Sequence, residues 1–276
     1  MKLAFSTLGV PGAPLSEVVA LAADHGYQGV ELRAHPEEPV HPGLGTAERR
    51  RAAEEFRAAG VEVLAVAGYA RVAAPGSDGP VLAELRALLG LARDLGARHV
   101  RVFPGAGERP EDEADADAVR RLAAVAPYAA ELGVRLLVET HDSHRTGAAV
   151  ARLLGRVEHG GVVGPDEIGH GAVGAIWDVL HPWLGGEEPT DSYAALAPHL
   201  AYVQLKDVAS ADDTTPLPLG AGVLPLTECL GLLSRAGWDG WLCWEYEKRW
   251  YPRVPELAGL LGAAREWLRR LPGAAP

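Results

Sequence analysis

Four strand-like runs in the second half of the sequence each end in a side chain that carries an oxygen. These side chains are Glu139, Asp178, Gln204 and Glu245, and each follows a short apolar run such as Leu136–Val138. A polar group at the end of a buried strand lies beside the core, where it is costly unless it has a partner. A metal ion or a bound substrate is the usual partner of such a cluster.

Electrostatic repulsion limits how these acids can coexist. Three carboxylates about 5 Å apart repel by about 3 kcal/mol per pair at an effective dielectric constant of 20, or about 10 kcal/mol together. That rivals the stability of an ordinary domain, so either some acids stay protonated or a cation neutralises them. Carboxylate and amide oxygens favour Mg²⁺ or Mn²⁺, with Co²⁺ or Zn²⁺ as alternatives. We therefore expect one divalent metal ion bound by Glu139, Asp178, Gln204 and Glu245.

A repeated unit of helix, glycine and apolar strand must position these residues. Its glycines are Gly26, Gly60, Gly96, Gly133 and Gly237, and the first four follow one another at intervals of 34 to 37 residues. Each stands where the end of a helix requires a positive φ angle. This spacing fits βαβ units and a parallel sheet.

Eight strand–helix units in 276 residues predict a single-domain (β/α)8 TIM barrel over residues 1–276 and not an open doubly wound sheet. The sixth helix and the Gly-rich segment Gly155–Gly174 are poorly defined, and the latter lacks phosphate-loop spacing. The strands are expected near Lys2–Leu8, Gly29–Arg33, Glu62–Ala67, His99–Phe103, Arg135–Thr140, Ala175–Val179, Ala201–Lys206 and Gly240–Tyr246. The helices are expected near Leu15–His25, Thr46–Ala59, Pro80–Leu95, Glu113–Leu132, Ala148–Arg156, Tyr193–Leu196, Leu224–Ala236 and Pro255–Leu271.

The composition excludes several classes of function. A formal net charge of −11 counts against nucleic-acid binding, which relies on clustered Lys and Arg, but it does not exclude an anionic substrate. Cys229 and Cys243 have neither metal-type nor disulfide spacing, so we expect buried thiols in a reducing cytoplasm. No apolar run approaches membrane-spanning length, and the short N-terminal run is typical of a first strand.

In a TIM barrel, catalytic groups sit at the C-terminal ends of the strands, where the four oxygen ligands are expected. The residues there also resemble the xylose-isomerase-like superfamily of sugar phosphate isomerases and epimerases. The resemblance covers most of the chain. Its matching runs are Gly29-Val-Glu31-Leu-Arg33, Leu137-Val-Glu139-Thr-His141, Ile176-Trp-Asp178-Val-Leu-His181, Tyr202-Val-Gln204-Leu-Lys206-Asp207, Leu219-Gly-Ala-Gly222 and Ala236-Gly237-Trp-Asp-Gly240-Trp with Glu245.

This resemblance implies that Glu139, Asp178 and Glu245 bind the metal and that His181 reaches the substrate. Many family members have a metal-binding His where this chain has Gln204, and hydroxypyruvate isomerases of the superfamily resemble this chain at that position. An amide oxygen shifts the expected metal from Zn²⁺ toward Mg²⁺ or Mn²⁺.

The implied reaction moves a proton next to a carbonyl of a small sugar or hydroxy-keto acid through a metal-stabilised enediolate. Glu139 and Glu245 would be the base and the acid on the two faces of the substrate. His181 would donate a hydrogen bond to a substrate oxygen.

Four further residues are expected to contact the substrate. Glu31 either lines the pocket or pairs with Arg33 at the surface. His141 lies on the same face as Glu139. Lys206 meets a substrate anion or neutralises an acid. Arg249, in the loop after the eighth strand, is placed for a lid or clamp together with Trp250.

Other residues carry structural expectations. Asp207 should point away from the site and be structural, and Trp177 and Trp244 should belong to the core. Alternation alone leaves Arg101 facing either the pocket or the helices.

Three alternatives compete with the isomerase. A lyase that dehydrates an inosose or a dehydroshikimate-like ring would use the same cation and base. A non-catalytic barrel would bind a sugar or a metal without turnover. A DNA-repair endonuclease of related fold is disfavoured, because it needs more His ligands and a basic face. Exposed apolar residues expected around Leu180–Leu184 and Trp250 would allow a homodimer.

Overall fold

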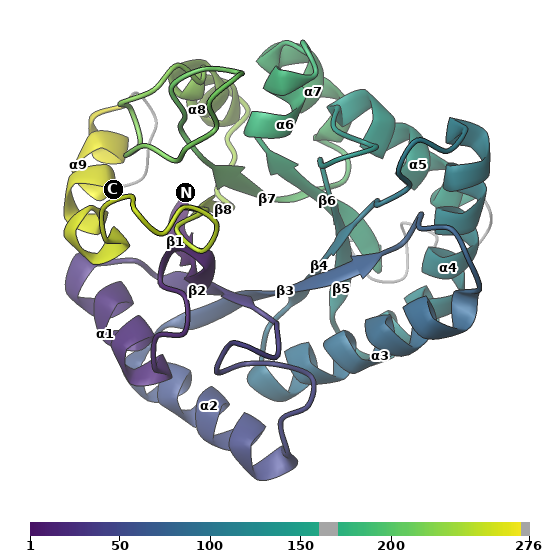
Figure 1. Cartoon of the computed structure of the whole chain (residues 1–276), viewed down its shortest axis with the longest axis horizontal. Helices are drawn as coiled ribbons and strands as arrows, with labels where there is room; N and C mark the ends of the chain where they lie inside the picture. Colours follow the sequence, from purple (N-terminus) through teal and green to yellow (C-terminus); the bar gives the residue numbers. More distant parts are fainter. Residues whose placement is uncertain (160–170, 272–276) are drawn as a thin grey trace.

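The computed structural model describes residues 1–159 and 171–271, in which a closed barrel of parallel strands is surrounded by helices (Figure 1). This confirms the predicted (β/α)8 TIM barrel. The strands are β1 (Lys2–Ser6), β2 (Gly29–Arg33), β3 (Glu62–Arg71), β4 (His99–Phe103), β5 (Arg135–Glu139), β6 (Val173–Asp178), β7 (Leu200–Leu205) and β8 (Trp241–Trp244). The helices are α1 (Leu15–His25), α2 (Thr46–Ala59), α3 (Asp78–Leu95), α4 (Glu111–Leu132), α5 (Gly147–His159), α6 (Leu180–Leu184), α7 (Pro189–Leu196), α8 (Leu226–Arg235) and α9 (Leu261–Arg270), with 3₁₀ helices η1 (Thr7–Gly9) and η2 (Leu257–Gly259).

The recurrent glycines end their helices as predicted. Gly26, Gly60, Gly96 and Gly133 adopt φ angles of 68°, 68°, 75° and 66°, and Gly237 follows α8 with φ 69°. A side chain at such a position strains the backbone, so glycine lets the chain leave the helix and enter the next strand.

The main differences from the expected elements lie after β6 and β8. The expected short helix Tyr193–Leu196 begins earlier, at Pro189, whose fixed φ suits the first turn of α7. A separate helix, α6, directly follows β6. The expected last helix is split, because the chain passes through η2 before α9 begins at Leu261.

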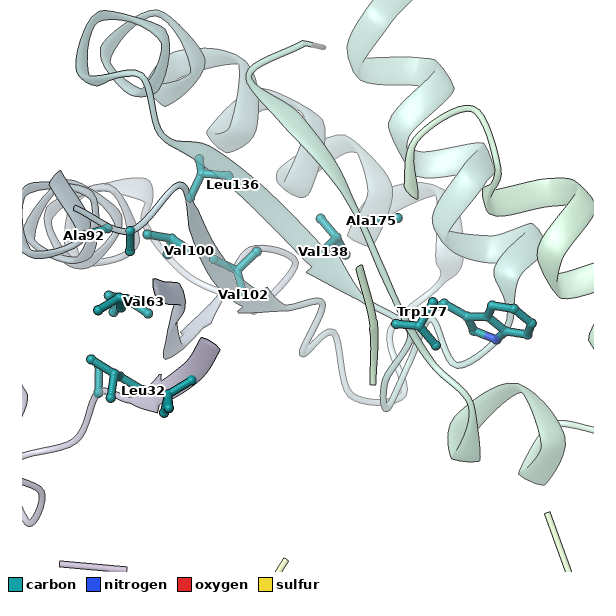
Figure 2. Close-up of a cluster of buried hydrophobic side chains, with 14 of the residues drawn as sticks. Leu32, Val63, Ala92, Val100, Val102, Leu136, Val138, Ala175 and Trp177 are labelled. Carbon is teal, nitrogen blue, oxygen red and sulfur yellow. The ribbon is translucent and has the colours of Figure 1, made fainter. Parts of the chain in front are cut away.

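Alternation along the strands divides the apolar residues into two clusters. One set packs between the barrel and its helices, and Figure 2 shows part of it, with Val100 of β4 near Ala92 of α3 and Trp177 of β6 farther along the same layer. The other set fills the barrel interior and consists of Ala4, Leu64, Ala65, Leu137, Ile176, Tyr202, Trp241 and Cys243.

Apart from Leu64 and Ala65, where the register of β3 shifts, the interior residues of a strand alternate with outward-facing ones, and the next inward residue lies nearer the C-terminal end. Leu137 therefore precedes Glu139, and Ile176 precedes Asp178, on the inner face. The outer residues of β6 and β8 include Trp177 and Trp244, each 1% exposed, which confirms their placement in the core.

The expected exposure around α6 is wrong in part. Leu180 and Pro182 are buried, because α6 folds back against the barrel, whereas Trp250 is 51% exposed as expected. Most of the Gly-rich segment Gly155–Gly174 lies outside the described residues. Among the residues that the structure describes, no helix is long and apolar enough to cross a membrane.

His99 at the start of β4 should make stability depend on pH. Burial, and then the positive charges of Arg135 and Arg98, lower the pKa of this histidine from 6.5 to about 4. The unfolded chain therefore takes up the proton first, so stability is lost as the pH falls from 6.5 toward 4. The His99→Asn variant lacks the titrating group but can keep a donor toward the Leu64 carbonyl. Between pH 7 and pH 5 we expect its free energy of unfolding to fall by about 2 kcal/mol less than that of the wild type.

Urea unfolding of both proteins at the two pH values measures this difference. Equal losses in both proteins would show that other groups dominate the acid sensitivity.

Candidate active site

The three acids expected at the C-terminal end of the barrel lie together. Glu139, Asp178 and Glu245 each offer a carboxylate oxygen within 4.8 Å of those of the other two. Their exposed fractions are 1%, 0% and 2%. Strands β5, β6 and β8 deliver them to the same level, which is the arrangement that the alternation of the strands predicts.

Asp178 is held rigidly by its neighbours. The Thr140 hydroxyl accepts a hydrogen bond from the Asp178 backbone N–H and donates one to its carbonyl, each at 3.0 Å. The backbone N–H of Leu180 donates to Asp178 Oδ1 at 2.8 Å. These contacts fix the carboxylate and leave Oδ2 directed into the site.

Arg101 of β4 faces the barrel interior and lies between two of the acids. Its Nη1 is 3.3 Å from Glu139 Oε2 and 3.1 Å from Glu245 Oε1, while its Nη2 donates to the Gly68 carbonyl at 3.1 Å. Arg101 belongs to the site although the alternation of β4 left its direction open. It is paired in register with Leu137, which lies inside the barrel.

Lys206 contacts three acids just after β7. Its Nζ is 2.7 Å from Asp178 Oδ2, 2.6 Å from Glu245 Oε2 and 2.7 Å from Glu247 Oε1. Burial works against the charged ammonium, but the carboxylates around it outweigh burial and raise the pKa of Lys206 well above its usual value.

Lys206 therefore neutralises acids, which is one of the two roles expected from the sequence, and Arg101 adds a second basic group. Arg101 and Lys206 supply part of the compensation from the chain itself, because both share the interior parity of the acids. Four buried acids (Glu31, Glu139, Asp178 and Glu245) stand against these two basic groups, so full ionisation leaves a formal charge of −2.

The remaining imbalance appears in the pKa values. Burial, reinforced by the charges of Glu245 and Asp178, raises the pKa of Glu139 well above its usual value against the opposing effect of Arg101. Burial also raises the pKa of Asp178. Burial acts in the same direction on Glu245, but Lys206 and Arg101 outweigh it and lower the pKa of this carboxyl.

Glu31 and Gln204 form a buried polar pair on the inner face of β2 and β7. The Gln204 Nε2 donates to Glu31 Oε2 at 3.1 Å and to Glu245 Oε1 at 3.2 Å. The Tyr202 hydroxyl donates to Glu31 Oε2 at 2.5 Å. Glu31 does not pair with Arg33, which instead contacts Glu38 at 2.5 Å.

Gln204 Oε1 is buried and lacks a hydrogen-bond partner among the described residues, while Glu139 Oε2 and Asp178 Oδ2 are contacted by the charged groups of Arg101 and Lys206. A buried acceptor without a partner costs about 1–3 kcal/mol, so the Gln204 oxygen beside this group of buried carboxylates calls for a ligand. Carboxylate and amide oxygens form a donor set for a hard divalent cation, which would also offset the residual charge of −2. The residues present therefore fit a divalent metal ion.

His141 and His181 lie beside the acids at a more open level. Their ring centroids are 4.1 Å apart, and His141 is 4.4 Å from the ring of Phe103. One nitrogen of each imidazole also lies within 4.8 Å of a Glu139 oxygen. Burial, and then the charge of Lys206, lower the pKa of His181 well below 6.5, so this imidazole is neutral at neutral pH.

The loop after β5 places His141. Asp142 adopts a φ of 35°, a strained value for a residue with a side chain. Its Oδ1 accepts hydrogen bonds from the Gly105 backbone N–H at 2.9 Å and from the Ser143 hydroxyl at 2.8 Å. These contacts tie the loop to the end of β4 and thereby fix the direction of His141.

Arg249 and Trp250 lie at the rim, in the loop after β8. Arg249 pairs with Glu37 of the loop after β2. The guanidinium of Arg33 lies 5.4 Å from the ring centroid of Trp250. The loop is thereby joined to the loop after β2 across β1, while Arg249 makes no described contact with the three acids.

Asp207 points away from the site and is structural, as expected. Its carboxylate accepts hydrogen bonds from the backbone N–H groups of Val208, Gly220, Gly222 and Leu224 at 2.9–3.2 Å. A Cβ at Gly222 would come within 2.3 Å of Asp207 Oδ1, so this close approach requires glycine.

Two curated relatives span much of the chain. A candidate hydroxypyruvate isomerase of Streptomyces coelicolor is 27% identical over 272 residues, covering 91% of this chain and 92% of that protein. A 3-dehydroshikimate dehydratase of Bacillus anthracis is 23% identical over 203 residues, covering 71% of this chain and 68% of that protein. Both relatives are described as enzymes.

Solved structures show the same fold. D-psicose 3-epimerase from Clostridium cellulolyticum H10 superposes with a TM-score of 0.80 at 15% identity, over 98% of this chain and 99% of that one. The IOLI protein, described with a bound zinc atom, superposes with a TM-score of 0.78 at 18% identity, over 95% of each chain. The family model described as xylose isomerase-like TIM barrel matches residues 19–271, and the chain belongs to that family.

Proposed function

We propose that this protein is a divalent-metal-dependent isomerase or epimerase that moves a proton next to a carbonyl of a small sugar or hydroxy-keto acid. The observation that carries the proposal is the cluster of buried carboxylates on Glu139, Asp178 and Glu245, together with the Gln204 amide oxygen, which has no hydrogen-bond partner among the described residues. These four residues would hold the metal. The similarity to a candidate hydroxypyruvate isomerase supports this reaction class.

A bound divalent ion would supply Lewis acidity toward the carbonyl and hydroxyl oxygens of the substrate. The amide of Gln204 favours Mn²⁺ or Mg²⁺ over Zn²⁺, although a related barrel is described with zinc.

Glu139, Glu245 and His181 would take different parts in the proton transfer. Because burial raises the pKa of Glu139, its carboxylate accepts a proton more readily than an ordinary carboxylate does. Glu245 lies across the site, and Lys206 and Arg101 favour its ionised form. Neutral His181 can donate a hydrogen bond to a substrate oxygen, and His141 stands beside it at the open level.

Lys206 serves mainly to balance the acids, because all three of its close contacts are carboxylates. Arg249, at the rim, is placed to meet the distal part of a substrate. The free, buried Cys229 and Cys243 are consistent with a reducing cytoplasm as the location.

The second candidate is a dehydratase on the same site. The similarity to a 3-dehydroshikimate dehydratase favours it. Its reaction also begins with removal of a proton beside a carbonyl, so the same base and cation would serve. The two candidates differ in whether a hydroxyl group then leaves.

Replacing the proton-transfer residues should stop turnover without unfolding the protein. Glu139→Gln and Glu245→Gln should each lower kcat/KM by about 10²–10⁴-fold, because an amide cannot take up the proton. The assay follows hydroxypyruvate and a panel of keto sugars in D₂O, where proton exchange at carbon reports isomerisation. Glu54→Gln, a change of an exposed acid on α2, is the matched control.

Circular dichroism checks that each variant is folded. Full activity in both variants would exclude the two-acid mechanism, and loss of water from 3-dehydroshikimate without isomerisation of any keto substrate would select the dehydratase.

Metal content tests the site directly. Protein dialysed against Mn²⁺ should retain about one ion per chain, and Asp178→Asn should weaken binding by at least about tenfold because a charged ligand is lost. Asp213→Asn, in an exposed turn, should bind as the wild type does. Less than about a tenth of an ion per wild-type chain would contradict a metal enzyme and favour a non-catalytic sugar-binding barrel.

The buried Arg101 should be essential to the metal-free protein. Arg101→Met removes compensation from Glu139 and Glu245 and should lower the free energy of unfolding by about 3–5 kcal/mol. Arg50→Met, which breaks the exposed pair with Glu54 on α2, should cost less than about 1 kcal/mol. Urea unfolding in EDTA measures the free energy of unfolding of both variants. If Arg101→Met lost no more stability than the surface control, the site acids would need no basic partner.

A further inference from the structure

Gln204 is the one neutral side chain among the four proposed ligands, and only one end of its amide can bind a cation. The carbonyl oxygen is a ligand, whereas the NH₂ group is a donor that a cation repels. A half turn about the last side-chain bond exchanges the two ends. Metal binding therefore depends on what fixes the amide orientation.

The groups around the Gln204 NH₂ are acceptors. Its Nε2 lies 3.1 and 3.3 Å from the two oxygens of Glu31 and 3.2 Å from Glu245 Oε1. Ionised carboxylates accept hydrogen bonds and cannot donate them. The flipped amide would set its oxygen against these carboxylate oxygens, so the observed orientation is strongly favoured. This orientation leaves Gln204 Oε1 buried and without a hydrogen-bond partner in the part of the chain that the structure describes.

Glu31 is itself held in place. The Tyr202 hydroxyl donates to its Oε2 at 2.5 Å, and Tyr202 lies on the same strand as Gln204, two residues earlier. Glu31 has an exposed fraction of 0%, and its oxygens are already engaged by the Tyr202 hydroxyl and the Gln204 amide. Glu245 is a proposed ligand, so Glu31 is the acceptor available solely to orient the amide.

We propose that Glu31 is a positioning residue that aims the Gln204 carbonyl oxygen at the metal ion, an inference that rests on the proposed metal site. Tyr202, Glu31 and Gln204 then form a relay of hydrogen bonds that ends in a ligand. Glu31 acts through Gln204 and does not contact the substrate, which differs from the contact expected from the sequence. Residues that orient metal ligands typically change metal affinity about 10–100-fold when they are replaced.

A double-mutant cycle separates the effect of Glu31 on the orientation of the Gln204 amide from the effect of its negative charge on the metal ion. Mn²⁺ affinity is measured by titration calorimetry for the wild type, Glu31→Gln, Gln204→Met and the double variant. Glu31→Gln should weaken binding about 10–100-fold, because two amides facing each other no longer fix the flip. In the Gln204→Met background, which has no amide to orient, the same change should weaken binding by less than about threefold.

Two outcomes overturn the inference while leaving the metal site intact. One is wild-type affinity in Glu31→Gln; the other is an equal loss of affinity in both backgrounds, which would show that Glu31 acts through its charge alone. A wild-type protein that takes up no Mn²⁺ would overturn the proposed function together with this inference.

Tyr202→Phe provides a second measurement if Glu31→Gln fails to fold, as judged by circular dichroism. It keeps the charge of Glu31 and removes only the hydrogen bond that holds it. We expect Mn²⁺ affinity to fall severalfold, and unchanged affinity in folded Tyr202→Phe would contradict the relay.

Discussion

Compensation of buried charge is the constraint on which the C-terminal end of this barrel depends. Acids from β2, β5 and β6 and the acid just after β8 lie out of contact with water, where an isolated carboxylate is not tolerated. Arg101 and Lys206 stand between them, each within contact distance of at least two acids. In such a network each charge is stable only because the others are present, so no member can be considered alone.

The barrel brings these charged groups together because side chains alternate between its inside and its outside along each strand. Every strand sends alternate side chains inward, so residues near the C-terminal ends of β4 to β8 converge without help from loops. Bulky apolar groups such as Trp177 face the helices instead, where they pack without crowding the site. The loops carry a smaller part, in which Asp142 and Asp207 fix local turns and hold His141 and the Leu219–Gly222 segment.

The fold and the three clustered acids follow from local patterns in the sequence. Glycine spacing locates the units, and the position of Glu139, Asp178 and Glu245 at strand ends places them at one level. The direction of Arg101 does not follow from the sequence, because β4 is buried on both faces. Which of its residues face inward is fixed by its register with β3 and β5. The partners of Glu31 are also hidden, since Tyr202 and Gln204 lie more than 170 residues away along the chain.

The position of Lys206 has a consequence for the protein before any metal ion or substrate is bound. Its ammonium is tethered to β7, so it reaches Asp178 and Glu245 as soon as the barrel closes. The chain thus supplies a counter-ion for these two acids from its own sequence. If the proposed divalent ion binds here, it would exchange with this tethered ammonium for the same carboxylates.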